Sequence, residues 1–405
     1  MAIVQNERFN TFPAWCQTCD PDREAEGWKI ENKDIENCIK NFQRKAIKYC
    51  EVIEWIPYNE LNDVKKIGEG GFGTVYSATW PKGVRTTDYE KYERLRKKEC
   101  LVELKTLPGF PTNPSDFLRE FKNHMRCRLE GSSLEVYGLT QNEENEYLMV
   151  FQYTNKGNLH KYLRSNFNSL KWENKLQQLI CVSYDLARIH RAGYTHNDLH
   201  PGNILQNQFI RKIRSFIADL GLSRMKNNKI PEDYIYGVMP YVAPEVLSGK
   251  KYTSPADIFS FGVIMTEMST GIKPFDGYEF DSKLAVKIYK GEQPVFAFGT
   301  PNCYIKLAKQ CMNLDPYKRP TAKDICLKLT QWQNILRDFA TLGCDKDEVL
   351  YIKEEFLKAD EIIKELQIPP PKHPDSKYSS QIINTNQIIN AIGIYKKLLN
   401  RYLLY

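Results

Sequence analysis

Apolar residues recur along this chain with two different periods, one typical of helices and the other of strands. Helical spacing predicts amphipathic helices at about 34–53, 176–192 and 345–366. Short runs that are rich in β-branched and aromatic residues predict strands at 64–67, 74–80, 101–105 and 146–153. The predicted strands are therefore concentrated before residue 156, and long helices dominate after it.

The first predicted helix has one apolar face. This face is formed by Ile35, Cys38, Ile39, Phe42, Ala46 and Ile47. Upstream of it, Cys16 and Cys19 have the spacing of half a zinc knuckle, in which two thiolates on one turn bind the same metal ion. The next cysteines, Cys38 and Cys50, fall inside the predicted helix and do not complete the motif. We therefore favour a plain exposed turn at 16–19 and keep a degenerate zinc knuckle as the alternative.

Composition narrows the class of protein. The 405 residues exceed one average domain and suffice for a large core. The net charge of +7, from 57 basic and 50 acidic residues, is spread along the chain, so we expect no nucleic-acid partner. Most of the 11 cysteines stand singly in apolar stretches, which favours a reducing, cytoplasmic setting. No apolar run approaches the roughly 18 residues of a membrane span.

Residues 196–205, with the sequence HNDLHPGNIL, carry the most specific chemistry in the chain. Asp198 precedes Asn203 by five positions, and Asp219 follows on a nearby turn. Such a group can place a carboxylate at an acceptor hydroxyl and two oxygen ligands at nucleotide-bound magnesium. The stretch resembles the catalytic loop of protein kinases, with 219–221 as their metal-binding turn. It equally resembles the loop of small-molecule phosphotransferases of the aminoglycoside and choline kinase type.

Three later motifs favour protein kinases over small-molecule kinases. They are Ala243-Pro244-Glu245, the stretch DIFSFG from Asp257, and Arg319-Pro320-Thr321. In this order they resemble the A-P-E, D-x-x-S-F-G and R-P-T elements of protein kinases. The resemblance runs from about residue 62 to 336 and is greatest to the tyrosine-kinase-like group of serine/threonine kinases. It implies that Glu245 and Arg319 form a buried ion pair and that Asp257 supports the catalytic loop.

The resemblance implies an α+β, two-lobed protein kinase fold with a small antiparallel β lobe that includes one helix, and a larger, mainly helical lobe. Residues 1–61 would be a mostly helical N-terminal extension, 62–155 the small lobe, 156–336 the large lobe and 337–405 a C-terminal tail. The charged segment 81–99 is longer than a kinase core requires between two strands. We therefore predict that it is a solvated insertion.

The resemblance also assigns site residues. The glycine-rich sequence G-x-G-x-x-G-x-V joins two predicted strands, as in the kinase hairpin that lies over the phosphates. The implied nucleotide-binding residues are Gly68, Glu69, Gly70, Gly71, Phe72, Gly73, Val75, Lys105, Gln152 and Thr154. Lys105 would contact the α- and β-phosphates of ATP, with Glu120 as its ion-pair partner. Asp198 is the implied catalytic base, and Asn203 and Asp219 are the implied Mg²⁺ ligands. His196 is expected to brace the metal-binding turn.

Glu103 departs from the family pattern on the strand that carries Lys105. Alternation along a strand places both side chains on one face, where the family has a small alanine beside the adenine. A carboxylate in such a place is costly unless it is paired or turned aside. Lys97 and Lys98 are alternative phosphate-binding lysines in less suitable sequence contexts.

Further departures concern the catalytic loop and the segment 219–245. Asn197 replaces the arginine that binds an activation-loop phosphate, His200 replaces the lysine of serine/threonine kinases, and Val238 replaces a threonine. We therefore expect this segment to be ordered by apolar packing rather than by a phosphate. The residues predicted to pack are Ile230, Tyr234 and Tyr236, and the few potential phosphate acceptors are Ser223, Tyr234 and Tyr236.

The sequence thus predicts a protein kinase that transfers the γ-phosphate of ATP to serine or threonine hydroxyls of protein substrates, using Mg²⁺, in intracellular signalling. After the Pro-rich sequence 369–374 we expect Ser/Asn-rich turns and a last apolar stretch, 382–405, that docks either on the kinase core or on a regulatory partner. The alternative is a pseudokinase scaffold that binds nucleotide and partners with little or no phosphotransfer. Glu103, Asn197 and His200 favour the scaffold, whereas retention of the implied catalytic residues argues against it.

Overall fold

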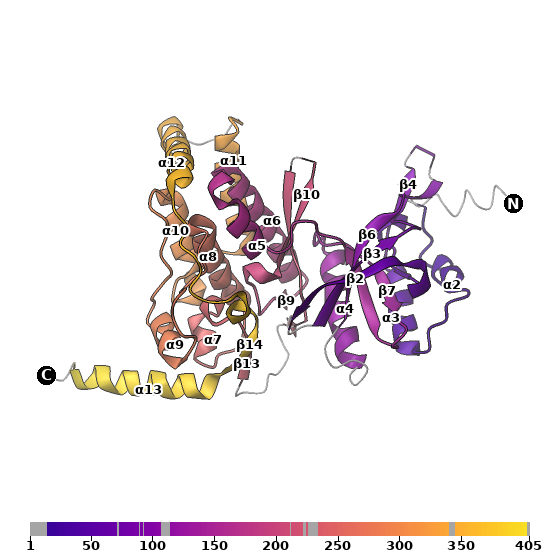
Figure 1. The fold of residues 1–405 in the computed structure, drawn as a ribbon, viewed down its shortest axis with the longest axis horizontal. Coiled ribbons are helices and arrows are strands. Elements are labelled where there is room, and N and C mark those ends of the chain that lie inside the picture. The colour runs from indigo at the N-terminus through magenta and orange to yellow at the C-terminus, as the bar shows by residue number, and fades with distance from the viewer. Residues whose placement is uncertain are drawn as a thin grey trace. The chain divides into compact units, whose positions relative to one another are not determined.

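The computed structural model describes residues 14–402 apart from 71–72, 89, 92, 107–113, 211, 222–223, 226–233 and 340–344. The chain divides into two compact units, residues 1–153 and residues 154–405. Figure 1 shows that strands dominate the first unit and helices the second. This distribution agrees with the positions of strands and helices that the hydrophobic pattern predicts, and with the α+β organisation that the resemblance implies.

The first unit contains one main sheet and two longer helices. Its elements are α2 (Asp20–Glu24), α3 (Lys33–Gln43), η1 (Tyr49–Glu51), β1 (Glu54–Trp55), η2 (Tyr58–Glu60), β2 (Asn62–Gly70), β3 (Gly73–Trp80), β4 (Arg85–Asp88), β5 (Glu93–Arg96), β6 (Cys100–Lys105), α4 (Pro114–Leu129), β7 (Val136–Gln141) and β8 (Tyr147–Gln152). The described strands of the main sheet have the order β1-β7-β8-β6-β3-β2. All described pairs in it are antiparallel except β1 with β7.

Alternation along β6 positions the residues of interest. Val102 and Leu104 are fully buried and pack against Trp80 and Val150 in the core of this unit. The intervening Glu103 and Lys105 are half-buried on the opposite face. Successive side chains of a strand point to opposite faces, so the core contacts of β6 fix the direction of Lys105.

The first amphipathic helix is shorter than its apolar pattern predicts. Asn32 caps α3 by accepting from the backbone N–H of Asp34, and the helix ends at Gln43 rather than near residue 53. The Gln43 side chain donates to the Ile53 carbonyl, and the Glu51 carboxylate accepts from backbone N–H groups at 47 and 48. These local bonds stabilise a tight return of the chain. Ile47 is consequently 66% exposed and does not belong to the apolar face, contrary to the prediction.

The charged segment 81–99 is not a solvated insertion. It forms the antiparallel hairpin β4–β5, and the guanidinium of Arg85 is buried between the carboxylates of Glu24 and Glu54. Arg96 also pairs with Glu54, and Arg94 pairs with Asp20. The prediction was wrong because the carboxylates that neutralise these arginines lie far away in the sequence. The hairpin is therefore tied to the N-terminal extension by ion pairs within the first unit.

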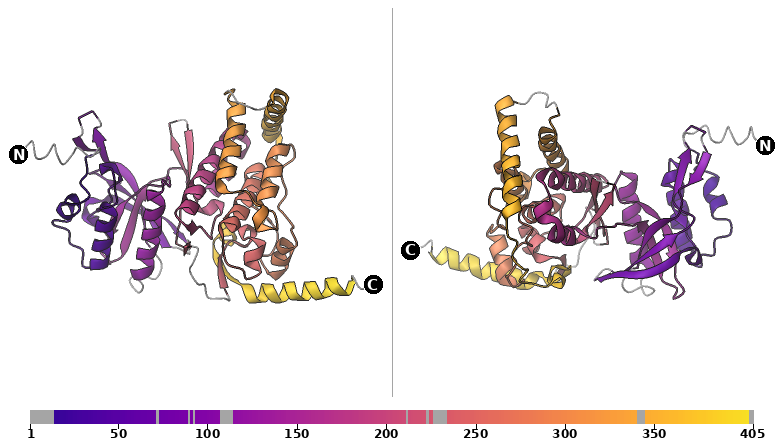
Figure 2. Two further views of the ribbon diagram at one scale, coloured as in Figure 1. Left: turned by 180° about the vertical axis from the view of Figure 1, so that it is seen from behind. Right: turned by 45° about the horizontal axis from the view of Figure 1, so that its top comes forward.

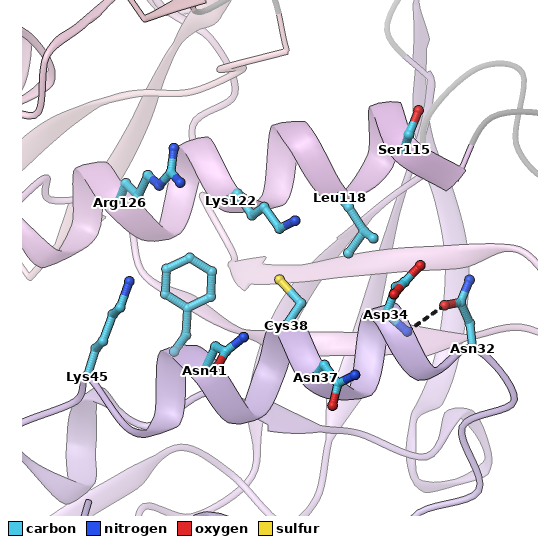
Figure 3. A pocket seen from close by; sticks show the side chains of 11 residues that line it. Asn32, Asp34, Asn37, Cys38, Asn41, Lys45, Ser115, Leu118, Lys122 and Arg126 are labelled. Carbon is cyan, nitrogen blue, oxygen red and sulfur yellow. Dashed lines mark hydrogen bonds between the residues drawn. The ribbon is translucent and has the colours of Figure 1, made fainter.

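Helices α3 and α4 run side by side and leave a groove of about 890 Å³ between them. Figure 3 shows Leu118 and Lys122 on α4 extending toward α3, with Cys38 of α3 between the two helices. Burial raises the pKa of the Cys38 thiol to about 11, although nearby basic residues lower it. The thiol is therefore kept in its protonated, weakly reactive form.

The second unit is mainly helical. Its elements are α5 (Leu159–Asn166), η3 (Phe167–Ser169), α6 (Trp172–Arg191), β9 (Tyr194–Thr195), η4 (Pro201–Asn203), β10 (Ile204–Phe209), β11 (Lys212–Ile217), β12 (Arg224–Met225), β13 (Tyr234–Gly237), η5 (Met239–Tyr241), α7 (Pro244–Leu247), α8 (Ser254–Thr270), α9 (Ser282–Tyr289), α10 (Asn302–Cys311), η6 (Pro316–Lys318), α11 (Ala322–Leu336), α12 (Lys346–Glu365), η7 (Asp375–Tyr378), β14 (Gln381–Asn384) and α13 (Thr385–Tyr402).

Helix α8 is the centre of the second unit. Its residues from 256 to 269 are all buried, as expected for a helix that is apolar on every side. Beside it, the Arg319 guanidinium donates to both carboxylate oxygens of Glu245, at 2.6 and 2.8 Å, and also to the Pro255 carbonyl. The predicted buried ion pair between Glu245 and Arg319 is therefore confirmed.

The C-terminal segment docks on the second unit. Helix α12 follows the predicted boundaries closely, with Asp345 as its N-cap, and packs against α6 and α11. Strand β14 pairs with β13, and α13 lies against α7 and α9 along the outside of this unit (Figure 2). Within the described parts of the chain, every helix is too short or too polar to cross a lipid bilayer.

Candidate active site

The glycine-rich motif joins two antiparallel strands, as predicted, and does not open a helix. Gly68 pairs with Val75, and Gly70 pairs with Gly73, across β2 and β3. Gly73 has a φ of 118°, and a Cβ there would lie 2.1 Å from the Thr106 carbonyl oxygen. Only glycine fits such a close approach of two backbones. Gly71 and Phe72 lie outside the described residues.

Lys105 and Glu120 form a buried ion pair. The Lys105 ammonium lies 2.9 Å from the Glu120 carboxylate, and their side chains are 12% and 2% exposed. Burial alone would raise the pKa of Glu120, but the Lys105 charge and a hydrogen bond from His124 lower it to about 2. The carboxylate is therefore ionised at neutral pH. Lys97 and Lys98, the alternative lysines, are exposed.

Three further residues implied for nucleotide binding lie on β3, at the end of β8 and just after β8. Val75 on β3 is opposite Lys105 on β6, and both are half-buried. Gln152 ends β8, and Thr154 is a buried residue at the start of the second unit. Glu103 lies on the same face of β6 as Lys105, as predicted. This residue also interacts with a neighbouring group.

Asp198 is held in a small network of polar side chains. The Asn203 amide donates to the Asp198 carboxylate at 3.1 Å and to its backbone carbonyl at 3.0 Å. The His200 Nδ1 accepts from the Gly202 backbone N–H, so its Nε2 carries the proton and lies 3.6 Å from the carboxylate. Burial would raise the pKa of Asp198, but His200 and hydrogen bonds lower it. The side chain is therefore an anionic acceptor.

The backbone around Asp198 is fixed by Asp257 on α8. Its carboxylate accepts from the backbone N–H groups of His196 and Asn197, at 2.8 and 3.0 Å. This confirms the predicted support of the catalytic loop. Asn197 has a φ of 70°, in the left-handed region that asparagine tolerates better than most residues. The asparagine therefore fits the backbone conformation of the loop.

The turn at Asp219 is connected to the same loop. His196 donates from Nε2 to the Ala218 carbonyl, and the Ala218 backbone N–H donates to the Asn203 carbonyl. Burial lowers the pKa of His196, so the ring is neutral and fits the bracing role predicted for it. Asp219 has a φ of 62° and accepts from the Gly221 backbone N–H. Asn203 and Asp219 thus lie on two turns that are connected by the hydrogen bond from the Ala218 backbone N–H to the Asn203 carbonyl.

The strand that precedes the A-P-E motif differs from the prediction. Tyr234 and Tyr236 are 53% and 45% exposed, whereas the intervening Ile235 is 8% exposed. Because these residues form strand β13, their side chains alternate, and the tyrosines do not provide the packing that we expected. Ser223 and Ile230 lie outside the described residues. The main-chain partner of β13 is β14 of the C-terminal segment.

The site contains one residue that the sequence did not indicate. Ser380 precedes β14, and its hydroxyl donates a short hydrogen bond to the Asp198 carboxylate. The same hydroxyl lies 3.3 Å from the His200 Nε2. In sequence this residue belongs to a stretch that resembles ordinary turns. Only the pairing of apolar β14 with a strand 147 positions earlier brings it to Asp198.

The fold and this constellation define a protein kinase. The profile of the family described as "Protein tyrosine and serine/threonine kinase" matches residues 61–329, and the chain belongs to this family. The two-lobed kinase fold with terminal extensions, predicted from the motifs, is thereby confirmed.

Curated relatives agree with the family assignment. A serine/threonine-protein kinase/receptor of Acanthamoeba polyphaga mimivirus is 29% identical over 68% of this chain and 16% of its own length. A serine/threonine-protein kinase of Dictyostelium discoideum is 29% identical over 68% of this chain and 10% of its own length. A serine/threonine/tyrosine-protein kinase of Arabidopsis thaliana is 28% identical over 47% of this chain and 49% of its own length. The chain thus matches only a small part of the first two relatives.

The donor set at 203 and 219 fits a magnesium ion bound together with a nucleotide. Mg²⁺ commonly takes one or two protein oxygens and completes its shell with phosphate oxygens and water. The amide nitrogen of Asn203 is held by Asp198, which directs the amide oxygen away from that residue. Among the described residues, no three or more His, Cys, Asp or Glu side chains form a group that could hold a metal ion by themselves. Cys16 and Cys19 therefore belong to no such group in the described structure.

Proposed function

We propose that this chain transfers the γ-phosphate of ATP to serine or threonine hydroxyls of protein substrates. The buried ion pair between Lys105 and Glu120 carries the proposal, because a formed pair of this kind is required to hold the phosphates in an active kinase. The names of the relatives support serine and threonine as acceptors.

The roles of the residues follow from their surroundings. Lys105 would contact the α- and β-phosphates, together with backbone N–H groups of the hairpin formed by β2 and β3. Asn203 and Asp219 would hold Mg²⁺, which neutralises charge on the phosphates when it is bound. Asp198, ionised and accessible to a hydroxyl, would orient the acceptor and take its proton.

Transfer from labelled ATP to a serine/threonine peptide and to a tyrosine peptide tests this proposal. We expect Mg²⁺-dependent labelling of the first peptide, and loss of at least about 100-fold in the Asp198→Asn variant, because a positioned general base contributes roughly 10²–10⁴-fold. Removal of Mg²⁺ with a chelator should abolish the labelling.

A wild-type rate no higher than that of Asp198→Asn would contradict the proposal. Calorimetric binding of ATP by that inactive protein would then support the pseudokinase scaffold. Preferential labelling of the tyrosine peptide would retain the kinase but overturn the proposed acceptor.

A further inference from the structure

The C-terminal segment occupies the position at which an acceptor meets Asp198. Strand β14 adds to β13 in an antiparallel ladder that pairs Ile235 with Ile383 and Gly237 with Gln381. Addition of an extended segment to a strand edge is a common mode of peptide recognition, in which main-chain bonds fix the register. The residue next to Gln381 is Ser380, so this register places its hydroxyl at Asp198.

The segment is anchored on both sides of Ser380. On the N-terminal side, Tyr378 is 2% exposed and donates to the Pro274 carbonyl at 3.0 Å. Further upstream, the Asp375 carboxylate lies 2.7 Å from the Lys273 ammonium. On the C-terminal side, Ile388 and Ile392 of α13 are buried. The two anchors leave little freedom for the intervening serine.

The contact at Ser380 has the form of an acceptor hydroxyl on its general base. The serine hydroxyl donates a hydrogen bond to the Asp198 carboxylate. His200 presents a protonated Nε2 at 3.3 Å from the same serine oxygen. Its neighbour Ser379 is exposed and donates instead to the Ser376 carbonyl. Of these two adjacent serines, only Ser380 is presented to Asp198.

We propose that Ser380 is an intramolecular phosphate acceptor, modified by the same chain that carries it. This inference rests on the proposed kinase function. The Ser380 oxygen forms a bond to the γ-phosphorus of ATP while the bond from that phosphorus to the β,γ-bridging oxygen breaks. The hydroxyl proton passes to Asp198, and ADP leaves with the electron pair of the broken bond. The products are phosphoserine at 380 and ADP.

The modification changes the electrostatics of the segment. A phosphoserine adds about −1.5 to −2 charges next to the ionised Asp198. Two anions at hydrogen-bond distance in a buried site repel each other, whereas the unmodified hydroxyl is a hydrogen-bond donor to the carboxylate. The unmodified segment therefore fits the site and the modified segment does not.

The test uses the full chain, treated with phosphatase and then freed of it. After incubation with ATP and Mg²⁺, phosphopeptide mapping should find phosphate at 380. Ser380→Ala should abolish that signal, and Ser379→Ala, the matched control in the same segment, should retain it. Ile388→Asp removes a buried anchor of α13 and should slow labelling of 380 at least tenfold, while an added serine peptide is still phosphorylated.

Transfer within one chain is distinguished from transfer between chains by two measurements. The rate of labelling at 380 should be unchanged over a tenfold range of protein concentration. In a mixture with active wild-type chain, the Asp198→Asn chain should remain unlabelled at 380. A rate proportional to concentration, or labelling of the inactive chain, would overturn the intramolecular step.

The remaining outcomes separate this inference from the proposed function. Labelling of an added serine peptide without any phosphate at 380 would overturn the inference alone and identify the segment as an inhibitory substrate mimic. Absence of labelling on both the peptide and 380 would overturn the kinase function and the inference with it.

Discussion

The environment of single side chains sets the strongest constraints on this site. Glu120 is almost completely buried and remains ionised because Lys105 and His124 lie beside it. An ionised carboxylate in such a place is stable only while its partners are present. Lys105 therefore has a structural role within the first unit as well as the proposed contact with phosphates.

Lys105→Met is expected to lower phosphate transfer at least 100-fold and to reduce the free energy of unfolding by about 1–3 kcal/mol, since it leaves Glu120 buried without its strongest partner. The double variant Lys105→Met/Glu120→Gln should regain most of the stability and none of the activity. Chemical denaturation and peptide labelling measure the two effects. Activity that survives in Lys105→Met would show that another lysine contacts the phosphates.

Lys175 in the second unit is a buried basic side chain, whereas Glu120 is a buried acidic one. Its side chain is 0% exposed, its ammonium lies 3.8 Å from the centre of the Phe167 ring, and it has no hydrogen-bond partner among the described residues. Burial lowers its pKa to about 7, although the Asp360 charge raises it. The unfolded chain therefore binds more protons than the folded chain between pH 7 and the ordinary lysine pKa of about 10.4, and stability rises with pH across this window.

Lys175→Met should therefore stabilise the second unit, by about 1–3 kcal/mol at pH 6, where the full cost of the buried group applies. The gain should be smaller at pH 9, where the folded chain has already released the proton. Denaturation at the two pH values measures this difference. Lys358→Met, at an exposed position of α12, is the control and should change stability by less than about 0.5 kcal/mol. A gain that is equal at both pH values would contradict the assigned titration.

At the scale of elements, the hairpin β4–β5 shows how charge can determine packing. The Arg85 guanidinium is 3% exposed and bonds to Glu24 and Glu54, which belong to segments before the glycine-rich motif. Both carboxylates lose contact with water when the hairpin packs against them. The positive charge of Arg85 is therefore needed to stabilise their ionised forms. The hairpin and the N-terminal extension are therefore expected to unfold together.

Arg85→Met should destabilise the first unit by about 2–4 kcal/mol, because it leaves two largely buried carboxylates without this partner. Arg119→Met is the matched control, since Arg119 forms an exposed pair with Asp116 on one helix and such pairs contribute less than about 1 kcal/mol. Hydrogen exchange of amides in α2 and β4 should increase in the first variant alone. Equal stability of the two variants would mean that the buried network contributes nothing.

At the scale of the whole molecule, the strand before the A-P-E motif is paired with a segment near the end of the chain. Asn197 lacks the charge that binds a phosphate, and β13 is held by main-chain pairing with β14. The exposed Tyr234 and Tyr236 contribute little packing to this order. We therefore expect β13 to be ordered by its main-chain pairing with β14 rather than by a phosphate bound through residue 197.

In the Ser380→Ala chain, where phosphate at 380 cannot affect the comparison, fully dephosphorylated protein is accordingly expected to retain most of its initial rate on an added peptide. The variants Tyr234→Phe and Tyr236→Phe should behave in the same way. The measurement compares initial rates before and after phosphatase treatment. A loss of tenfold or more, about 1.4 kcal/mol in the barrier, that is restored by rephosphorylation at 234 or 236 would contradict this expectation.

The sequence by itself determined the parts of this protein that depend on local spacing. The period of apolar residues fixes α6 and α12, and alternation in β6 fixes the face that Lys105 shares with Glu103. The motif around Asp198 predicts the catalytic loop. The structure then shows that the Asp257 carboxylate supports this loop by hydrogen bonds. These features could be predicted because each arises from residues within one element or from one family motif.

Only the tertiary structure decided the features that join distant segments. Helix α3 ends at Gln43 because a local side-chain bond overrides the periodicity of apolar residues. The burial of Arg85 and the position of Ser380 each depend on a partner far away in the sequence. A charged stretch or a serine-rich turn has the same pattern whether it is solvated or docked. Docking is decided by the desolvation and pairing of groups from separate segments, and no local pattern contains that information.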